Sequence, residues 1–123
     1  MAGSPSLGFP RSSRLKQRGD FVRARTEGLR LVCGCLIANV RPRASGVGSR
    51  LGVVTSKKIG GAVQRSRARR LMRESFRLHQ HDLRQPVDLV LIARPSIAGK
   101  PLAQVERDFL RVLKQGRLEK SVP

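Results

Sequence analysis

The chain has 123 residues, the usual size of one domain, and hydrophobic residues make up 39% of it. Its 26 lysines and arginines against eight acidic residues give a formal net charge of +18. A compact fold of this charge repels itself unless a polyanion neutralises it, so we expect nucleic acid as the partner.

Membrane insertion and secretion are not expected from this sequence. Its apolar runs are far shorter than the ~20 residues of a spanning helix, and its start lacks the cationic and apolar segments of a secretory signal. Cys33 and Cys35 are too closely spaced for an ordinary disulfide, and no second cysteine pair completes a zinc site. We therefore expect a cytoplasmic protein in which both thiols pack as small apolar groups.

Apolar periodicity and turn-forming residues predict six elements along the chain. They are a helix, two strands, a helix, a strand and a helix, over residues 14–25, 29–40, 51–56, 62–79, 87–93 and 102–113. Ser12 or Ser13 is expected to cap the first helix and Gly28 to end it, while Gly34 marks a bulge or a close approach within the first strand. The first two strands are expected to pair in antiparallel fashion.

This order, α-β-β-α-β-α, predicts an α+β domain in which helices pack against a small mixed sheet. Residues 1–13 are rich in Gly, Pro and Ser, so we expect a disordered, basic N-terminal extension. Residues 14–115 then form a single RNA-binding domain, and residues 116–123 form a flexible tail.

The segment from Lys57 to Arg77 is strongly basic and contains one acidic residue, Glu74. On a helix, one face carries a stripe of arginines at steps of four residues, with Arg70 beside it and Arg67 further round: Arg65, Arg69, Arg73 and Arg77. The apolar face carries Ala68, Leu71, Met72, Ser75 and His79. Like charges at this spacing destabilise an isolated helix by about 0.2–0.5 kcal/mol per pair. A solvated face is the usual explanation of a basic run, but the missing Glu at i−4 favours an anionic partner.

The residues from Ser56 to Arg77 resemble the signature of the bacterial ribonuclease P protein family. That signature runs Lys-Lys, a hydrophobic residue, Gly-Asn-Ala-Val, Arg-Asn-Arg, a basic pair and an Arg-Glu-like ending. The similarity extends over residues 14–115, through the opening Leu15-Lys16 to Asp20-Phe21 and the strand from Asp88 to Ser96. Two family asparagines are replaced here, by Gly61 and Ser66. Serine can still donate a hydrogen bond to RNA but lacks the paired donor and acceptor of an amide.

The resemblance implies a ribonuclease P protein-like fold, shared with a ribosomal-protein domain, in which one β-α-β crossover is left-handed. It implies an accessory subunit of an RNA-based endonuclease that removes the 5′ leader from precursor tRNA. The partners would be the catalytic RNA and precursor tRNA, with no DNA. The RNA would perform the chemistry with its own Mg²⁺, and the protein would aid the binding of substrate and Mg²⁺ without holding a cofactor or metal itself.

The resemblance also implies two RNA-binding regions. The residues expected to contact the catalytic RNA are Lys57, Lys58, Arg65, Ser66, Arg67, Arg69, Arg70 and Arg73. The leader is expected in a cleft formed by the sheet and the first helix, with Phe21, Lys16 and Arg14. A base can stack on the Phe21 ring, although a core position for this ring is an equally good interpretation.

No catalytic residue is expected in the protein. Its acidic residues are scattered along the chain, whereas a metal-dependent phosphodiesterase clusters carboxylates around Mg²⁺. Glu106 and Asp108 should point in different directions on their helix, and His79 and His81 have no nucleophile nearby in the sequence. Three alternatives stay open: a structural RNA-binding protein such as a ribosomal one, a DNA-binding helix module, and a self-sufficient nuclease.

Overall fold

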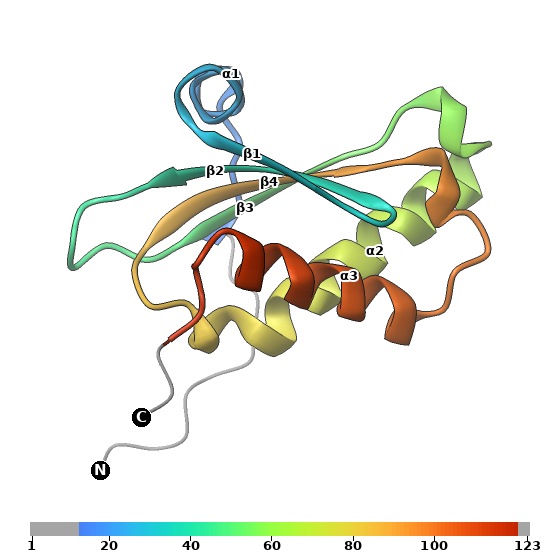
Figure 1. Cartoon of the computed structure of the whole chain (residues 1–123). Coiled ribbons are helices and arrows are strands. Elements are labelled where there is room, and N and C mark those ends of the chain that lie inside the picture. The colour runs from blue at the N-terminus through green and yellow to red at the C-terminus, as the bar shows by residue number, and fades with distance from the viewer. Residues whose placement is uncertain (1–12, 121–123) are drawn as a thin grey trace, which may run out of the picture.

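The computed structural model describes residues 13–120 as helices packed on both faces of a four-stranded sheet (Figure 1). The elements are α1 (Arg18–Glu27), β1 (Leu29–Cys33), β2 (Leu36–Pro42), β3 (Arg50–Val54), α2 (Ala62–His79), β4 (Val87–Ala93) and α3 (Leu102–Gln115), with the short 3-10 helices η2 (Lys57–Ile59), η3 (Gln80–Asp82) and η4 (Pro95–Ile97). The predicted α+β class is confirmed. None of the described helices is long and apolar enough to span a membrane.

The sheet has the strand order β1-β2-β4-β3. β2 pairs with β1 and with β4 in antiparallel fashion, whereas β3 and β4 are parallel. The predicted antiparallel pairing of residues 29–40 with 51–56 is therefore wrong, because β4 lies between β2 and β3. Parallel neighbours need a crossover connection, which α2 supplies here. The left hand of this crossover stays a prediction.

The predicted strand over residues 29–40 is wrong, because the chain forms a tight hairpin there. β1 and β2 pair from Leu29 with Val40 to Cys33 with Leu36, and Gly34 occupies the turn with φ of +58°. That conformation is open to glycine and strained for other residues. The element order is consequently α-β-β-β-α-β-α. A close approach at Gly34 is confirmed, since a Cβ there would lie 2.3 Å from Oδ2 of Asp108.

The first helix begins four residues later than predicted. Arg14 bridges to Leu51 of β3, and the backbone N–H of Leu15 donates to the Leu51 carbonyl at 2.9 Å. Ser13 therefore precedes an extended segment and does not cap α1, whose N-cap is Gln17 without a side-chain hydrogen bond. Ser12 lies outside the described residues. Gly28 ends the helix as expected.

Two layers of apolar side chains cover the sheet. α2 and α3 pack on one face and α1 on the other, as Figure 1 shows. The larger core includes Leu36, Leu89, Leu91, Met72, Phe76, Phe109 and Val112. The smaller core under α1 contains Leu15, Ala24 and Val90, with Phe21 and Ile92 packed against it. Both cysteines are free thiols in the interior, as expected, and burial raises the pKa of Cys35 to about 12.

The end of the described chain is packed against the domain. Leu118 is buried, Glu119 pairs with Leu83, and the N–H of Lys120 donates to the Asp82 carbonyl at 2.8 Å. Residues 116–120 thus belong to the domain, in contrast to the predicted flexible tail. Residues 1–12 and 121–123, where the rest of the predicted extension and tail fall, lie outside the described residues.

Replacing Gly34 by alanine should destabilise the domain. The new Cβ would clash with the Asp108 carboxylate, and alanine would have to adopt the left-handed backbone conformation of the turn. We expect the free energy of unfolding to fall by about 1–3 kcal/mol. Gly48→Ala is the matched control, because nothing lies within 4 Å of its Cβ position. Urea unfolding measures both changes. Equal midpoints for the two variants would contradict the described turn.

Candidate nucleic-acid interface

A basic surface covers η2 and the first two thirds of α2. We call it the α2 basic surface, and its members are Lys57, Lys58, Arg65, Ser66, Arg67, Arg69, Arg70 and Arg73. α2 begins and ends where the sequence predicts, and of its predicted inner face Ala68, Met72 and Ser75 are buried. Gly61 is the N-cap and offers no side-chain acceptor to the first N–H groups of the helix.

In the described part of the chain, the cations of the α2 basic surface lack acidic partners. Among the described residues, no carboxylate oxygen lies within 4.0 Å of any of their charged nitrogens. Other arginines do form ion pairs: Arg23, Arg41, Arg43, Arg50, Arg77 and Arg111. Arg77 forms an ion pair with Glu74, which lies three residues earlier on α2. The arginines of the predicted stripe that lack an acidic partner among the described residues therefore end at Arg73.

The cations of this surface repel one another. Burial, and then the charges of Arg14 and Arg69, lower the pKa of the Arg73 guanidinium. Arg14, which was expected beside Phe21, therefore lies close enough to α2 to act on Arg73. The structure extends the α2 basic surface by this residue of the amino-terminal segment.

Neighbouring polar groups hold the guanidinium of Arg69 in place. It donates from Nη1 to Oγ1 of Thr55 at 2.7 Å and from Nη2 to Oγ of Ser66 at 3.2 Å. Nη2 of Arg67 donates to the Lys100 carbonyl at 2.8 Å. Ser66, which stands where the family signature has asparagine, thus orients the adjacent arginine.

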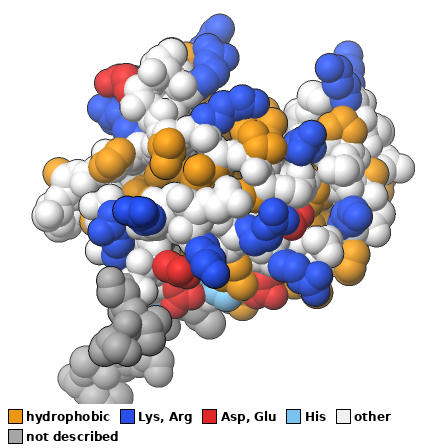
Figure 2. All heavy atoms as spheres, viewed as in Figure 1, with side chains coloured by type: hydrophobic (Ala, Val, Ile, Leu, Met, Phe, Trp, Pro, Cys, Tyr) orange, Lys and Arg blue, Asp and Glu red, His pale blue; other side chains and the backbone are white. Residues whose placement is uncertain are grey.

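A pocket of about 260 Å³ lies between α1 and the sheet. Its lining residues are Arg18, Phe21, Val22, Arg25, Asn39, Val54, Val90 and Ile92. Figure 2 shows apolar side chains gathered below α1 on this face, with lysine and arginine side chains around them. The predicted cleft between the sheet and the first helix is therefore present, and we call it the α1 pocket.

Phe21 serves both as a wall of the α1 pocket and as a packing residue. Its ring lies directly over the backbone of β3, because a Cβ on Gly52 would meet Phe21 Cε1 at 2.4 Å. The two interpretations of this ring, a stacking surface and a core position, are compatible. Phe21 is half-buried and packs against the smaller core while it lines the pocket. Lys16 and Arg14 do not line the pocket.

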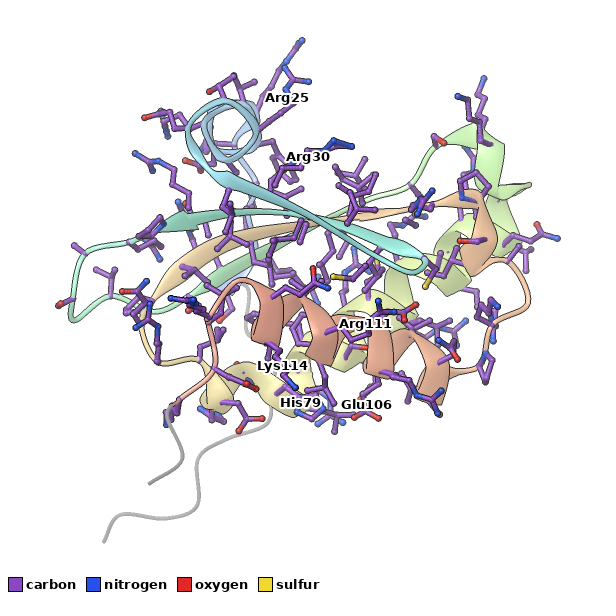
Figure 3. The ribbon with its side chains drawn as sticks, in the orientation of Figure 1. Arg25, Arg30, His79, Glu106, Arg111 and Lys114 are labelled. Carbon is purple, nitrogen blue, oxygen red and sulfur yellow. The ribbon has the colours of Figure 1, made fainter. Side chains whose placement is uncertain are left out.

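Sequence reasoning missed three polar residues of the α1 pocket. Arg18 and Arg25 lie on the Phe21 face of α1 at helical spacing, which is a signal present in the sequence. Asn39 is 4% exposed and lines the pocket. Asn39 faces Arg30 across the strands, and Figure 3 shows Arg25 and Arg30 on the α1 side of the sheet.

Buried ion pairs position α1 over the sheet. Arg50 of β3 donates from Nε and Nη2 to the two oxygens of Asp88, each at 2.8 Å, and its Nη1 lies 3.4 Å from Oδ2 of Asp20 on α1. Both carboxylates are buried. Burial raises the pKa of Asp20, but the hydrogen bond from Arg23 and the charges of Arg50 and Arg23 outweigh it and lower that pKa overall.

Three further acidic residues also hold parts of the domain together. Nε2 of His79 contacts Glu106 at 2.8 Å, as Figure 3 shows, and Nδ1 contacts Asp82 at 3.0 Å. Asp108 accepts the N–H of Cys35 at 3.0 Å, so Glu106 and Asp108 point to different partners as expected. The described residues contain no group of three His, Cys, Asp or Glu side chains arranged to hold a metal ion.

The comparisons with known proteins agree with this arrangement. The sequence profile of the Ribonuclease P family matches residues 9–117. The ribonuclease P protein component of Desulfatibacillum aliphaticivorans is 39% identical over 107 residues, which cover 85% of this chain and 90% of that protein.

Solved structures give the same result. The RNase P protein of Staphylococcus aureus superimposes with a TM-score of 0.79 at 27% identity, covering 88% of this chain and 98% of the other. The RNase P protein of Thermotoga maritima superimposes with a TM-score of 0.73 at 30% identity, covering 87% and 98%. The chain therefore belongs to the ribonuclease P protein family, the accessory protein subunits of the ribonucleoprotein that processes the 5′ ends of tRNA.

Proposed function

We propose that this chain binds the catalytic RNA of ribonuclease P through the α2 basic surface and the 5′ leader of precursor tRNA through the α1 pocket. The observation that carries the proposal is the set of cations on η2 and α2 without acidic partners among the described residues. Such a surface gains free energy when phosphates displace its counterions.

The geometry of α2 suits a phosphate backbone. Side chains four residues apart on a helix are separated by about 6 Å along its axis, close to the spacing of successive phosphates on one strand. Arginine offers several donors in one plane and can bind two phosphate oxygens together. The hydrogen bonds to Thr55 and Ser66 hold Arg69 in one orientation before RNA binds.

The α1 pocket suits a single-stranded leader. Val54, Val90 and Ile92 form an apolar floor, and Phe21 offers a ring on which a base can stack without regard to sequence. Arg18 and Arg25 line the same pocket and can bind the phosphates on either side of that base. The side-chain amide of Asn39 in the pocket can offer a donor group and an acceptor to a base edge.

The protein acts in this mechanism by binding and by neutralising charge. The RNA positions Mg²⁺ and performs the hydrolysis of the phosphodiester. Bound cations of the protein reduce the repulsion between the catalytic RNA and the leader, which raises the affinity of the complex for substrate and for Mg²⁺. The cytoplasmic location stays a prediction.

Replacing Arg65 and Arg73 together by glutamine should weaken binding of ribonuclease P RNA. Each lost phosphate contact lowers the slope of log K against log salt by about one unit. Filter binding over a series of salt concentrations measures this slope. Arg77→Gln is the matched control on the same stripe, because Glu74 already neutralises Arg77. Equal slopes for the double variant and the control would contradict RNA binding through the α2 basic surface.

Replacing Phe21 by leucine should weaken binding of precursor tRNA to the reconstituted holoenzyme by about 1–3 kcal/mol, because leucine keeps the packing but offers no ring for stacking. Substrates with a long leader and with a single-nucleotide leader are compared in a titration. The loss is expected with the long leader alone. An equal loss with both substrates would assign Phe21 to the core and remove it from the leader site.

A further inference from the structure

A second basic hollow lies at the carboxyl end of α3, outside the α2 basic surface and the α1 pocket. Its volume is about 300 Å³, and it is lined by Arg84, Lys114, Arg117 and Glu119. All four side chains are exposed. Arg84 follows η3, Lys114 lies in the last turn of α3, where Figure 3 labels it, and Arg117 lies just beyond the helix. We call this site the C-terminal hollow.

Within residues 13–120, the cations of the C-terminal hollow form no ion pair. Glu119 lines the same hollow, yet within residues 13–120 no ion pair forms between it and Arg84, Lys114 or Arg117. Three positive side chains thus converge on a concave surface and remain available to an external anion. This is the electrostatic condition that also distinguishes the α2 basic surface.

Capping of α3 does not account for these side chains. The backbone alone closes the helix end: Gly116, Arg117 and Leu118 donate their N–H groups to the carbonyls of Val112, Lys114 and Leu113 at 2.9, 3.2 and 2.8 Å. These three carbonyls of the last turn therefore need no lysine or arginine side chain, although such side chains hydrogen-bond the last carbonyls of many other helices.

Arg117 occupies a backbone position that disfavours it. Its φ is +53°, the left-handed conformation that glycine adopts at most helix ends of this kind, and the glycine of this chain stands one residue earlier, at Gly116. Glycine at position 117 would make the same backbone hydrogen bonds with less strain. Arginine at this position carries a conformational cost, which is consistent with a use for its side chain.

The C-terminal hollow is separate from the α2 basic surface. Along α2, which ends at His79, Arg73 lies about 9 Å and Arg65 about 21 Å before the carboxyl end. The hollow lies beyond its carboxyl end, since the N–H of Arg84 donates to the Leu118 carbonyl at 2.8 Å. In Figure 1, α2 and α3 both run from the η2 side of the domain toward this end.

We propose that the C-terminal hollow binds phosphate groups of a second segment of the RNA partner, separate from the segment on the α2 basic surface. This inference depends on the proposed function for one point, namely that the bound polyanion is RNA. The protein then contacts the folded RNA at two separate places and fixes their relative position.

Charge-removing variants of the full chain test the hollow. Arg84→Gln and Lys114→Gln are combined, and ribonuclease P RNA binding is measured over a series of salt concentrations. The slope of log K against log salt should fall by about two units, one for each lost contact. Arg107→Gln is the matched control, because Arg107 is exposed on α3, lies outside the hollow and has no ion pair among the described residues. A fall of the same size per charge in the control would overturn the proposal.

The variant Arg117→Gly separates binding from folding. It relieves the backbone strain, so the denaturation midpoint should rise while the affinity for RNA falls. A raised midpoint with unchanged RNA affinity would show that Arg117 binds no phosphate, and would overturn its place in the site.

Hydroxyl-radical footprinting of the RNA locates the contact. The Arg84→Gln/Lys114→Gln variant should lose protection at nucleotides that the Arg65→Gln/Arg73→Gln variant still protects. Loss of the same nucleotides in both would overturn the second segment and leave the α2 site standing. Full protection in both variants would count against the proposed function as well.

Discussion

The structure depends on Arg50, which lies between two buried carboxylates. Asp88 of β4 and Asp20 of α1 both contact its guanidinium, and through it α1 is held on the sheet. α1 itself buries few residues, Asp20 and Ala24, so apolar contacts alone hold it weakly. Removal of one partner of such a buried pair costs about 3–5 kcal/mol, because a charge is left without compensation. The α1 pocket exists because this pairing fixes both of its walls.

The internal pairing of acidic side chains also explains where positive charge is left on the surface. The chain has eight acidic residues for 26 basic ones, and three of the acids, Asp20, Asp88 and Asp108, are buried on internal partners. Further carboxylates pair with Arg77 and His79. The fold thus uses its few negative charges to hold its own elements together, and the cations of the α2 basic surface and the C-terminal hollow are left for an external polyanion.

Sequence reasoning succeeds here for local features and fails for long-range ones. The limits and buried face of α2 follow from helical periodicity, and the basic surface follows from the spacing of its arginines. The hairpin was missed because Gly34 interrupts a run of aliphatic residues that reads as one strand, and the turn is defined by Asp108, 74 residues further along the chain. Asn39 could be assigned to the pocket only from the register of β2 against β1 and β4. Arg14 lies near α2 and outside the predicted cleft, because its segment pairs with β3.

The most direct measurement is cleavage of precursor tRNA by a bacterial ribonuclease P RNA at low Mg²⁺, with the protein, without it, and with the protein alone. We expect cleavage to rise when RNA and protein are combined, because the protein supplies charge and leader contacts while the RNA supplies the chemistry. Cleavage by the protein alone would contradict the assignment of catalysis to the RNA. RNA binding without any stimulation would contradict the proposed role and favour a structural RNA-binding protein.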